Sequence, residues 1–489
     1  MSAKRESFGS RMAVIFAMAG SAIGLGNIWR FPYMVGEHGG SVFILVYIIA
    51  TLLISMPVFV AEVVIGRRSR TNANTAFSRL SGGRRFWKAV GFLPILIPLV
   101  IASYYSVIGG WSLDYLFKSC AMTFSTTAPE EVSAIFDTFA SNGAEPVLMH
   151  LLFLLVTVVV VAGGVKYGIE KFSKITLPVL FVLIVAIAIY SICLPGAGEG
   201  VRYLVSPQPG ELTPRTFAYA MGQSFYSLSL GMGAIITYGS YVSKKENILA
   251  SSAGTAVSDL LFAILAGFAI MPAVFASGLE PGAGPGLIFR SVPYVFASIA
   301  GSAPVMSTIV AVIFFLAVVV AAMTSCISLV EVGVAYLVEK FGMKRPLASA
   351  LIFVLCGGAG VLCALNSTVF DRFDWMSSNI LLLLMALLVV IFVGFVMKKD
   401  DVRDEITNSG SLKSAEKLFP VVYFLIRWWL RWQWFSFSSA ISYFRIWRHK
   451  EKNSAAMQLP SWPLPGLPSV SETYGASLIW SASTEALHS

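Results

Sequence analysis

Two stretches of this chain, residues 20–27 (GSAIGLGN) and 227–233 (SLSLGMG), put glycine and polar residues into the middle of segments that are otherwise apolar enough to cross a membrane. We expect a helix to break at each of them. Inside a bilayer, a break leaves backbone N–H and C=O groups unpaired, which is tolerated only where the gap is buried in protein or lines a cavity. Small residues that pack two helices closely are the alternative explanation. Two corresponding breaks, each beside a potential cation ligand (Asn27, Ser227), favour a binding site instead.

Composition identifies the class of protein. Of the 489 residues, 56% are hydrophobic and 12% are charged, whereas soluble domains average about 25% charged residues. Apolar runs long enough to cross a bilayer, about 20 residues each, lie near residues 11–36, 41–66, 89–117, 147–165, 175–194, 216–242, 249–276, 303–338, 347–365 and 376–397. We therefore predict an all-α integral membrane protein with about 10–11 spans.

The charges between these runs predict the orientation. Alternate loops, from 67–88 to 398–417, hold 20 Lys and Arg residues, and the intervening loops hold 5. Because cytoplasmic loops are enriched in Lys and Arg, the N-terminus, with Lys4, Arg5 and Arg11, should be cytoplasmic in a multi-pass protein of the cell inner (plasma) membrane. The net charge of +9 mostly reflects this asymmetry, so we expect the lipid bilayer as a partner and no nucleic acid.

Signals for catalysis are weak. The five cysteines and four histidines show no metal-ligand spacing, and no nucleophile with a matching base is visible at membrane depth. We expect neither an enzyme nor an organic cofactor.

A few polar residues fall inside the apolar runs. A charge there costs about 2.5–3.5 kcal/mol on insertion scales, so Glu62, Asp259 and Glu331 should each have a partner. We expect Glu62 and Glu331 to accept hydrogen bonds from amides freed by the broken helices, and Asp259 to suit a hard cation such as Na⁺. The adjacent hydroxyls of Thr324 and Ser325 are a second candidate cation site, although such hydroxyls usually bond back to their own helix.

Four motifs carry a family resemblance: GLGNIWRFPY at 24–33, Tyr104-Tyr105, the stretch 223–233, and AAMTS at 321–325. Together they resemble the neurotransmitter:sodium symporters, closest to the bacterial amino-acid branch. The resemblance covers about residues 4–428. It implies one transmembrane transporter domain, residues 1–427, with discontinuous helices 1 and 6. The implied architecture is a five-plus-five inverted repeat, approximately 9–195 and 216–397.

The resemblance also implies ligands for two co-transported Na⁺ ions and a substrate pocket. The first Na⁺ site would consist of the substrate carboxylate with Ala22, Asn27, Ser227 and Asp259. The second would consist of Gly20, Ile23, Ala321, Thr324 and Ser325. The pocket for an amino-acid substrate would be lined by Ser21, Ala22, Leu25, Gly26, Ile101, Tyr105, Tyr226, Ser227, Ser229, Met232, Ser325 and Leu329.

Three positions bear on specificity. Monoamine-carrying relatives place an aspartate where Gly24 stands, so glycine favours a substrate that has its own carboxylate. The flexible Met232 suits large apolar or aromatic side chains. Chloride-dependent relatives carry Asn at the position of Asp259, and here a fixed carboxylate would replace the chloride. The resulting prediction is a sodium-coupled, chloride-independent amino-acid symporter that works by alternating access; the alternative is an amino-acid-binding membrane sensor without transport.

Two pairs resemble the gates of the family. Arg30 and Asp374 would close the extracellular side, and Arg5 and Glu339 the cytoplasmic side.

The C-terminal segment, residues 428–489, departs from the family. A final apolar span is expected there, yet the chain reads WWLRWQWF from Trp428 and ends in a Pro- and Ser-rich tail. Shifting the reading frame by one base turns several of these codons into Val, Ala or Met. Our hypothesis is a frameshift near residue 428 that replaces an eleventh span and leaves a disordered tail. The alternative is a Trp- and Arg-rich helix at the membrane interface.

Overall fold

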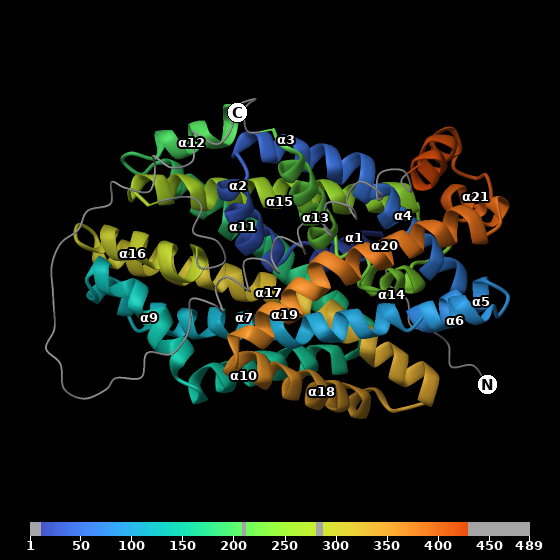
Figure 1. Ribbon diagram of the computed structural model, residues 1–489, viewed down its shortest axis with the longest axis horizontal. Helices are drawn as coiled ribbons and strands as arrows, with labels where there is room; N and C mark the ends of the chain where they lie inside the picture. Colours follow the sequence, from blue (N-terminus) through green and yellow to red (C-terminus); the bar gives the residue numbers. More distant parts are fainter. Residues whose placement is uncertain (1–10, 208–211, 280–286, 429–489) are drawn as a thin grey trace, which may run out of the picture. The chain divides into compact units, whose positions relative to one another are not determined.

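The computed structural model describes residues 11–207, 212–279 and 287–428, and its regular structure is helical throughout these ranges (Figure 1). This follows from the long apolar runs, because a helix pairs its own backbone groups where water is absent. Residues 429–489, on which the frameshift hypothesis depends, lie outside the described residues.

The first five predicted spans correspond to the following elements. They are α1 (Arg11–Ala22), η1 (Gly26–Arg30) and α2 (Phe31–Glu37); α3 (Ser41–Ala50), η2 (Thr51–Ser55) and α4 (Met56–Ser69); α7 (Leu93–Cys120); α10 (Ala144–Ala162); and η3 (Val165–Glu170) with α11 (Lys171–Ile192). Shorter helices connect them: α5 (Ala73–Leu80), α6 (Arg85–Val90), α8 (Thr123–Thr126), α9 (Pro129–Ser141) and α12 (Gly198–Val205).

The second five follow the same order. They are α13 (Pro214–Ser227) and α14 (Ala234–Tyr241); α15 (Ile248–Ala276); α17 (Pro304–Phe341); α18 (Arg345–Leu365); and α19 (Ser367–Met376), η7 (Ser377–Leu381), α20 (Leu382–Ile391) and η8 (Phe392–Val396). The connecting helices are η6 (Leu287–Ser291) and α16 (Val292–Ala300). After them come α21 (Lys399–Thr407) and a helix over residues 413–428.

Among the described residues, seven helices are long and apolar enough to cross a membrane, and counting two bent pairs as one span each gives nine. The remaining predicted run, 216–242, is occupied by α13 and α14, which have only 14 and 8 residues. The run is broken near its middle, as the sequence predicts.

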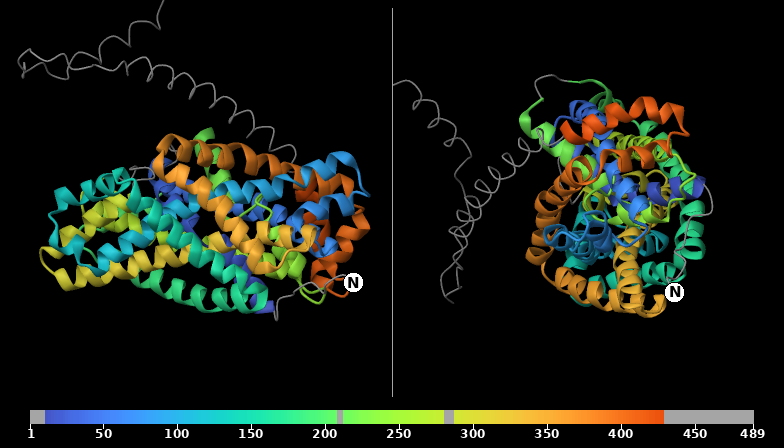
Figure 2. Two further views of the ribbon diagram at one scale, coloured as in Figure 1. Left: turned by 90° about the horizontal axis from the view of Figure 1, so that it is seen from below. Right: turned by 90° about the vertical axis from the view of Figure 1, so that its right-hand side faces the viewer.

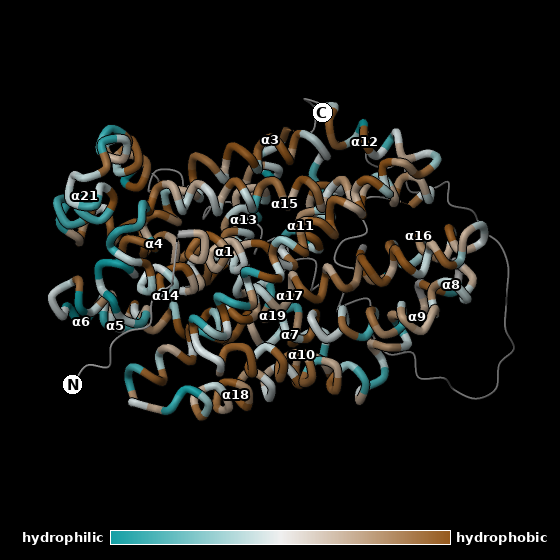
Figure 3. The backbone as a smooth tube through the Cα atoms, turned by 180° about the vertical axis from the view of Figure 1, so that it is seen from behind, coloured by the Kyte–Doolittle hydropathy of each residue, from teal (hydrophilic) through white to brown (hydrophobic). Residues whose placement is uncertain are grey.

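The long helices run between two ends of the helical unit (Figures 1 and 2). One end carries α9, α12 and α16, and the other carries α5, α6 and α21. Figure 3 shows that hydrophilic residues gather at the α21 end, whereas long helices such as α11 and α15 are mostly hydrophobic. Between the ends, α7 packs against α17, α10 and α18, while α14 packs against α4.

The two breaks differ in their backbone. The first is a bend of 48° between α1 and the segment that begins at Gly26. In the second, Ser229, Gly231 and Gly233 all have positive φ, at 54°, 73° and 70°. A Cβ at Gly233 would lie 2.3 Å from the Pro94 carbonyl oxygen, so both the turn and the close approach require glycine.

Candidate functional site

Backbone groups at the breaks are paired by side chains from neighbouring helices and from the opposite break. The Gly231 amide donates to Glu62 Oε1 at 2.7 Å, which confirms the expectation for this glutamate. Gln223 Nε2 donates to the Gly26 carbonyl at 2.8 Å, and Ser229 Oγ donates to the carbonyl of Ser21 at 2.7 Å. These bonds let two unwound segments face each other inside an apolar bundle.

Glu331 is engaged differently from our expectation. Its carboxylate accepts a hydrogen bond from the Tyr241 hydroxyl at 2.7 Å and forms an ion pair with Arg345. Arg345 also donates through Nε to the Val161 carbonyl at 2.9 Å. The charge that compensates Glu331 comes from α18, which the sequence does not indicate, and a broken-helix amide as a further partner stays a prediction.

A small cavity lies between the two breaks. Ten of the twelve predicted substrate residues line it: Ser21, Ala22, Gly26, Ile101, Tyr105, Tyr226, Ser229, Met232, Ser325 and Leu329. Its free volume is about 20 Å³, which is room for about one water molecule. An amino acid therefore fits only after the lining side chains move apart.

The other two predicted residues sit beside this cavity. The Leu25 amide donates to the Tyr105 hydroxyl at 3.0 Å, and Ser227 turns its hydroxyl toward Asp259. Gly24 leaves no space for a side chain, since a Cβ there would lie 1.9 Å from Ser325 Oγ and 2.9 Å from the Tyr105 hydroxyl.

Asp259 is the centre of a buried polar cluster. Its Oδ1 accepts hydrogen bonds from Asn27 Nδ2 at 2.8 Å and from Ser227 Oγ at 2.8 Å. Its Oδ2 accepts one from the Tyr47 hydroxyl at 3.1 Å. Three of the four residues predicted for the first Na⁺ site thus meet directly, and the fourth, Ala22, lines the adjoining cavity.

Among the residues that the structure describes, the charge of Asp259 has no cationic partner. The side chain is fully buried, and none of the ion pairs in the described ranges involves it. Hydrogen bonds from neutral donors offset only part of the cost of burying a carboxylate. A cation bound beside the oxygens of Asp259, Ser227 and Tyr47 would supply the missing charge, and oxygen ligands suit a hard ion.

The residues predicted for the second Na⁺ site are brought together only in part. Thr324 Oγ1 donates to the carbonyls of Ile23 at 3.1 Å and Ala321 at 2.9 Å. Ser325 Oγ instead donates to the Ser21 carbonyl at 3.2 Å. Gly20 faces α11, where a Cβ would lie 3.2 Å from Ser173 Oγ. The core of this set is therefore the Thr324 hydroxyl with one carbonyl of its own helix α17, Ala321, and the carbonyl of Ile23, which directly follows α1.

The predicted gates are placed as follows. Arg30 and Asp374 are both described, and no ion pair is formed between them; the Arg30 guanidinium lies over the Tyr226 ring, 4.7 Å from its centroid. Asp374 accepts a hydrogen bond from Ser378 Oγ at 3.2 Å. Glu339 accepts hydrogen bonds from the backbone and side chain of Asn72 at 2.7 and 3.0 Å. Its predicted partner Arg5 lies outside the described residues.

Sequence reasoning missed three residues of these networks: Tyr47, Tyr241 and Arg345. Tyr47 lies in an uninterrupted apolar run, where a tyrosine gives no local signal of a polar partner. In the sequence, Arg345 is one of several basic residues in a predicted connecting loop, so nothing marks it as the partner of a buried carboxylate. The expectation that each buried carboxylate has a partner calls for such donors, but only the fold identifies them.

Comparison with known proteins agrees with this geometry. The model of the sodium:neurotransmitter symporter family matches residues 5–132 and 129–465. A sodium-dependent transporter of Haemophilus influenzae is 35% identical over 86% of this chain and 96% of its own length. YhdH of Bacillus subtilis, likewise a sodium-dependent transporter, is 36% identical over 87% of this chain and 95% of its own length. The chain belongs to the sodium:neurotransmitter symporter family, a family of sodium-dependent transporters.

A solved structure gives the same fold. The crystal structure of MhsT in complex with L-phenylalanine matches with a TM-score of 0.79 and 38% sequence identity, covering 89% of this chain and 100% of that one. This chain is therefore a multi-pass membrane protein with two sets of five spans, each opening with a discontinuous helix.

Proposed function

We propose that this protein is a secondary symporter that imports an amino acid together with two Na⁺ ions. The observation that carries the proposal is the uncompensated, buried Asp259 among Asn27, Ser227 and Tyr47, beside a cavity between two broken helices. Each Na⁺ gains about 2.3 kcal/mol at 100 mV and about 1.4 kcal/mol from a tenfold gradient. Two ions supply roughly 7 kcal/mol, sufficient for about 10⁵-fold accumulation of a neutral zwitterion.

The substrate class we propose is large apolar or aromatic α-amino acids. The substrate carboxylate would accept a hydrogen bond from the Leu25 amide in place of the Tyr105 hydroxyl. At Gly24 there is no room for an acidic side chain, so the substrate has to bring its own carboxylate. Ile101, Leu329 and the flexible Met232 line the remainder of the cavity and would form its apolar walls. MhsT, 38% identical to this chain, was crystallised with L-phenylalanine, which supports the same class here.

Alternating access would work by opening one side at a time. We assign the α21 end to the cytoplasm, because the loops that meet there are rich in Lys and Arg. On the opposite side, Tyr226 lines the cavity and the Arg30 guanidinium lies over its ring, so these two residues would form the closure. On the cytoplasmic side, the Tyr241–Glu331 hydrogen bond joins α14 to α17. Arg5 and Glu339 would add a second closure there.

We also propose that transport does not require chloride. Two Na⁺ ions and a substrate ammonium bring three positive charges, and the substrate carboxylate cancels one of them. The fixed charge of Asp259 offsets another, so no mobile anion is needed beside it.

Residues 1–427 would form the transporter domain, and we keep the frameshift hypothesis for 428–489. Repeated sequencing of the gene tests it: a single-base discrepancy near codon 428 is expected, and an intact frame in every read would overturn it.

The decisive experiment is uptake by the purified chain in proteoliposomes, with the twenty amino acids tested one by one in Na⁺ and in choline. We expect Na⁺-dependent counterflow of aromatic or large apolar amino acids. A sensor would bind an amino acid with Na⁺ and show no counterflow. Counterflow that is equal in Na⁺ and choline would refute sodium coupling.

A further inference from the structure

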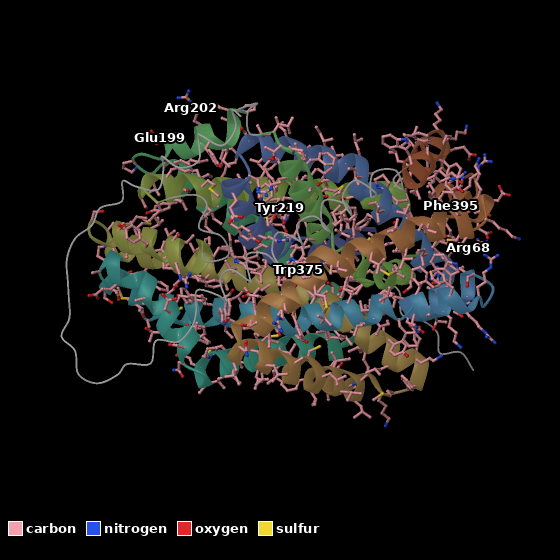
Figure 4. The ribbon with its side chains drawn as sticks, in the orientation of Figure 1. Arg68, Glu199, Arg202, Tyr219, Trp375 and Phe395 are labelled. Atoms are coloured by element: carbon pink, nitrogen blue, oxygen red, sulfur yellow. The ribbon has the colours of Figure 1, made fainter. Side chains whose placement is uncertain are left out.

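A second, larger cleft lies at the α21 end, far from the substrate cavity. Its volume is about 740 Å³. The end of the tenth span, α21 and the helix over residues 413–428 enclose it. Its lining combines aromatic side chains with three basic and two acidic ones and one proline: Phe395, Lys399, Asp400, Arg403, Glu416, Phe419, Pro420, Tyr423, Phe424, Arg427 and Trp428. Figure 4 labels Phe395 at this end, near Arg68 and opposite the end that carries Glu199 and Arg202.

Aromatic rings support two of the cations. The Arg427 guanidinium lies 4.7 Å from the centroid of the Phe395 ring and 6.0 Å from that of the Tyr423 ring. The Lys399 ammonium lies 5.9 Å from the same Tyr423 centroid. One tyrosine therefore brings two positive charges from different helices toward a common point.

The charges of the cleft do not cancel. Arg403 is paired with Glu416. Lys399 and Arg427 form no ion pair with any carboxylate of the described ranges. Three basic and two acidic side chains leave a surplus of one positive charge, which equals the single negative charge of a phosphodiester.

The scaffold of the cleft is held firmly and stands at a hydrophobic boundary. Arg67 and Glu405, each 1% exposed, form a 2.8 Å ion pair that ties α21 to α4. Arg67 also donates to Asn408 Oδ1 at 3.0 Å. On the rim of the cleft, Phe395 and Phe424 are 51% and 59% exposed. Trp428, which is 39% exposed, also lines the cleft, and tryptophan is typical of the level of lipid headgroups.

We propose that this cleft binds the phosphodiester headgroup of an anionic phospholipid from the leaflet that surrounds α21. Lys399 and Arg427 contact the phosphate, and the exposed faces of Phe395 and Phe424 contact the start of an acyl chain. Basic pockets between membrane helices are suited to such headgroups. The site is separate from the substrate cavity, so its occupancy does not depend on the transported molecule.

The test uses the full chain and native mass spectrometry with phosphatidylglycerol or phosphatidylethanolamine added to the purified protein. We expect the wild type to retain phosphatidylglycerol in preference to phosphatidylethanolamine. A basic residue near an anionic surface contributes about fivefold in affinity, so Lys399→Gln with Arg427→Gln should weaken phosphatidylglycerol binding about 30-fold. The matched control, Lys413→Gln with Lys417→Gln, removes the same charge from the 413–428 helix outside the cleft and should bind as the wild type does.

Three results would overturn the proposal. The first is equal retention of the two lipids by the wild type, a comparison that holds even if the cleft variant fails to fold. The second is an equal loss of affinity in the cleft and control variants, which would indicate a diffuse charge effect. The third is full displacement of phosphatidylglycerol by an equal concentration of soluble glycerol phosphate, which would mean that the cleft recognises a free phosphate.

Discussion

Replacing Thr324 by valine tests the second Na⁺ site with little change of shape. The hydroxyl is 3.1 Å from the Ile23 carbonyl oxygen and 2.9 Å from that of Ala321, and the side chain is 3% exposed. Valine occupies nearly the same volume but has no oxygen, so it removes one proposed ligand and leaves the others in place.

The expected magnitude follows from the chemistry of that oxygen. A polar contact to a charged group contributes about 1.5–3 kcal/mol, which corresponds to a 10- to 150-fold change in an equilibrium constant. The half-saturating Na⁺ concentration for amino-acid binding should therefore rise by at least about tenfold. Amino-acid affinity at saturating Na⁺ should change much less, because the substrate does not contact this hydroxyl in the proposed arrangement.

The assay is binding of a radiolabelled amino acid by the purified protein over a range of Na⁺ concentrations at constant ionic strength. Thr157→Val is the matched control. That hydroxyl is also fully buried and donates to the Phe153 carbonyl of its own helix at 3.0 Å, so its loss should leave the Na⁺ dependence unchanged. An unaltered Na⁺ dependence in the Thr324 variant would refute the site, and an equal shift in both variants would point to a general loss of stability.

Four further predictions concern other parts of the molecule. Gly24→Ala should weaken amino-acid binding more than tenfold, because its Cβ would overlap Ser325 Oγ, whereas Gly222→Ala, with open space around its Cβ, should not. Asp259→Asn should make uptake depend on chloride, measured against gluconate medium. Tyr241→Phe loses a 2.7 Å hydrogen bond that joins α14 to α17. Because α1 packs against both of these helices, amide hydrogen exchange in α1 should become several-fold faster. Burial and a nearby arginine lower the pKa of His38 to about 4. As the pH falls, His38 therefore takes up a proton at a higher pH in the unfolded protein than in the folded protein, which favours unfolding. The thermal unfolding midpoint of the wild type should decrease between pH 6.5 and 4, and that of His38→Gln should decrease less.

Each of these has a contradicting outcome. Equal binding by the two glycine variants would show that the Gly24 position is open in solution. Chloride-independent uptake by the asparagine variant would remove the charge-compensation argument. Unchanged exchange in α1 would mean that the Tyr241 bond does not hold the cytoplasmic side closed. A pH profile of unfolding identical to that of His38→Gln would show that this histidine titrates normally.

Much of the fold was predictable because the bilayer restricts the possibilities. The break at 227–233 was predictable from local composition, because a matching break at 20–27 and a neighbouring cation ligand favour a break over close helix packing by small residues. The partner of Glu62 could be inferred as well, because an acceptor at membrane depth needs a donor and a broken helix supplies one. The partner of Glu331 could not, because an arginine beyond the end of α17 reads as part of a charged loop until the helices are packed.

For the candidate site, the residue types and the helix breaks could be predicted from the sequence. Apolar length, the positions of glycine and the presence of Asp259 are properties of short segments, so they can be read without knowing the packing. Which of these polar groups meet became known from the packing of the helices. This packing brought Tyr47 from α3 onto Asp259 from α15, turned Ser325 toward Ser21 and kept Arg30 over Tyr226 without an ion pair to Asp374. Hydrogen bonds and ion pairs act over a few ångströms, and distances of that size between helices far apart in sequence are set by side-chain packing across the whole bundle.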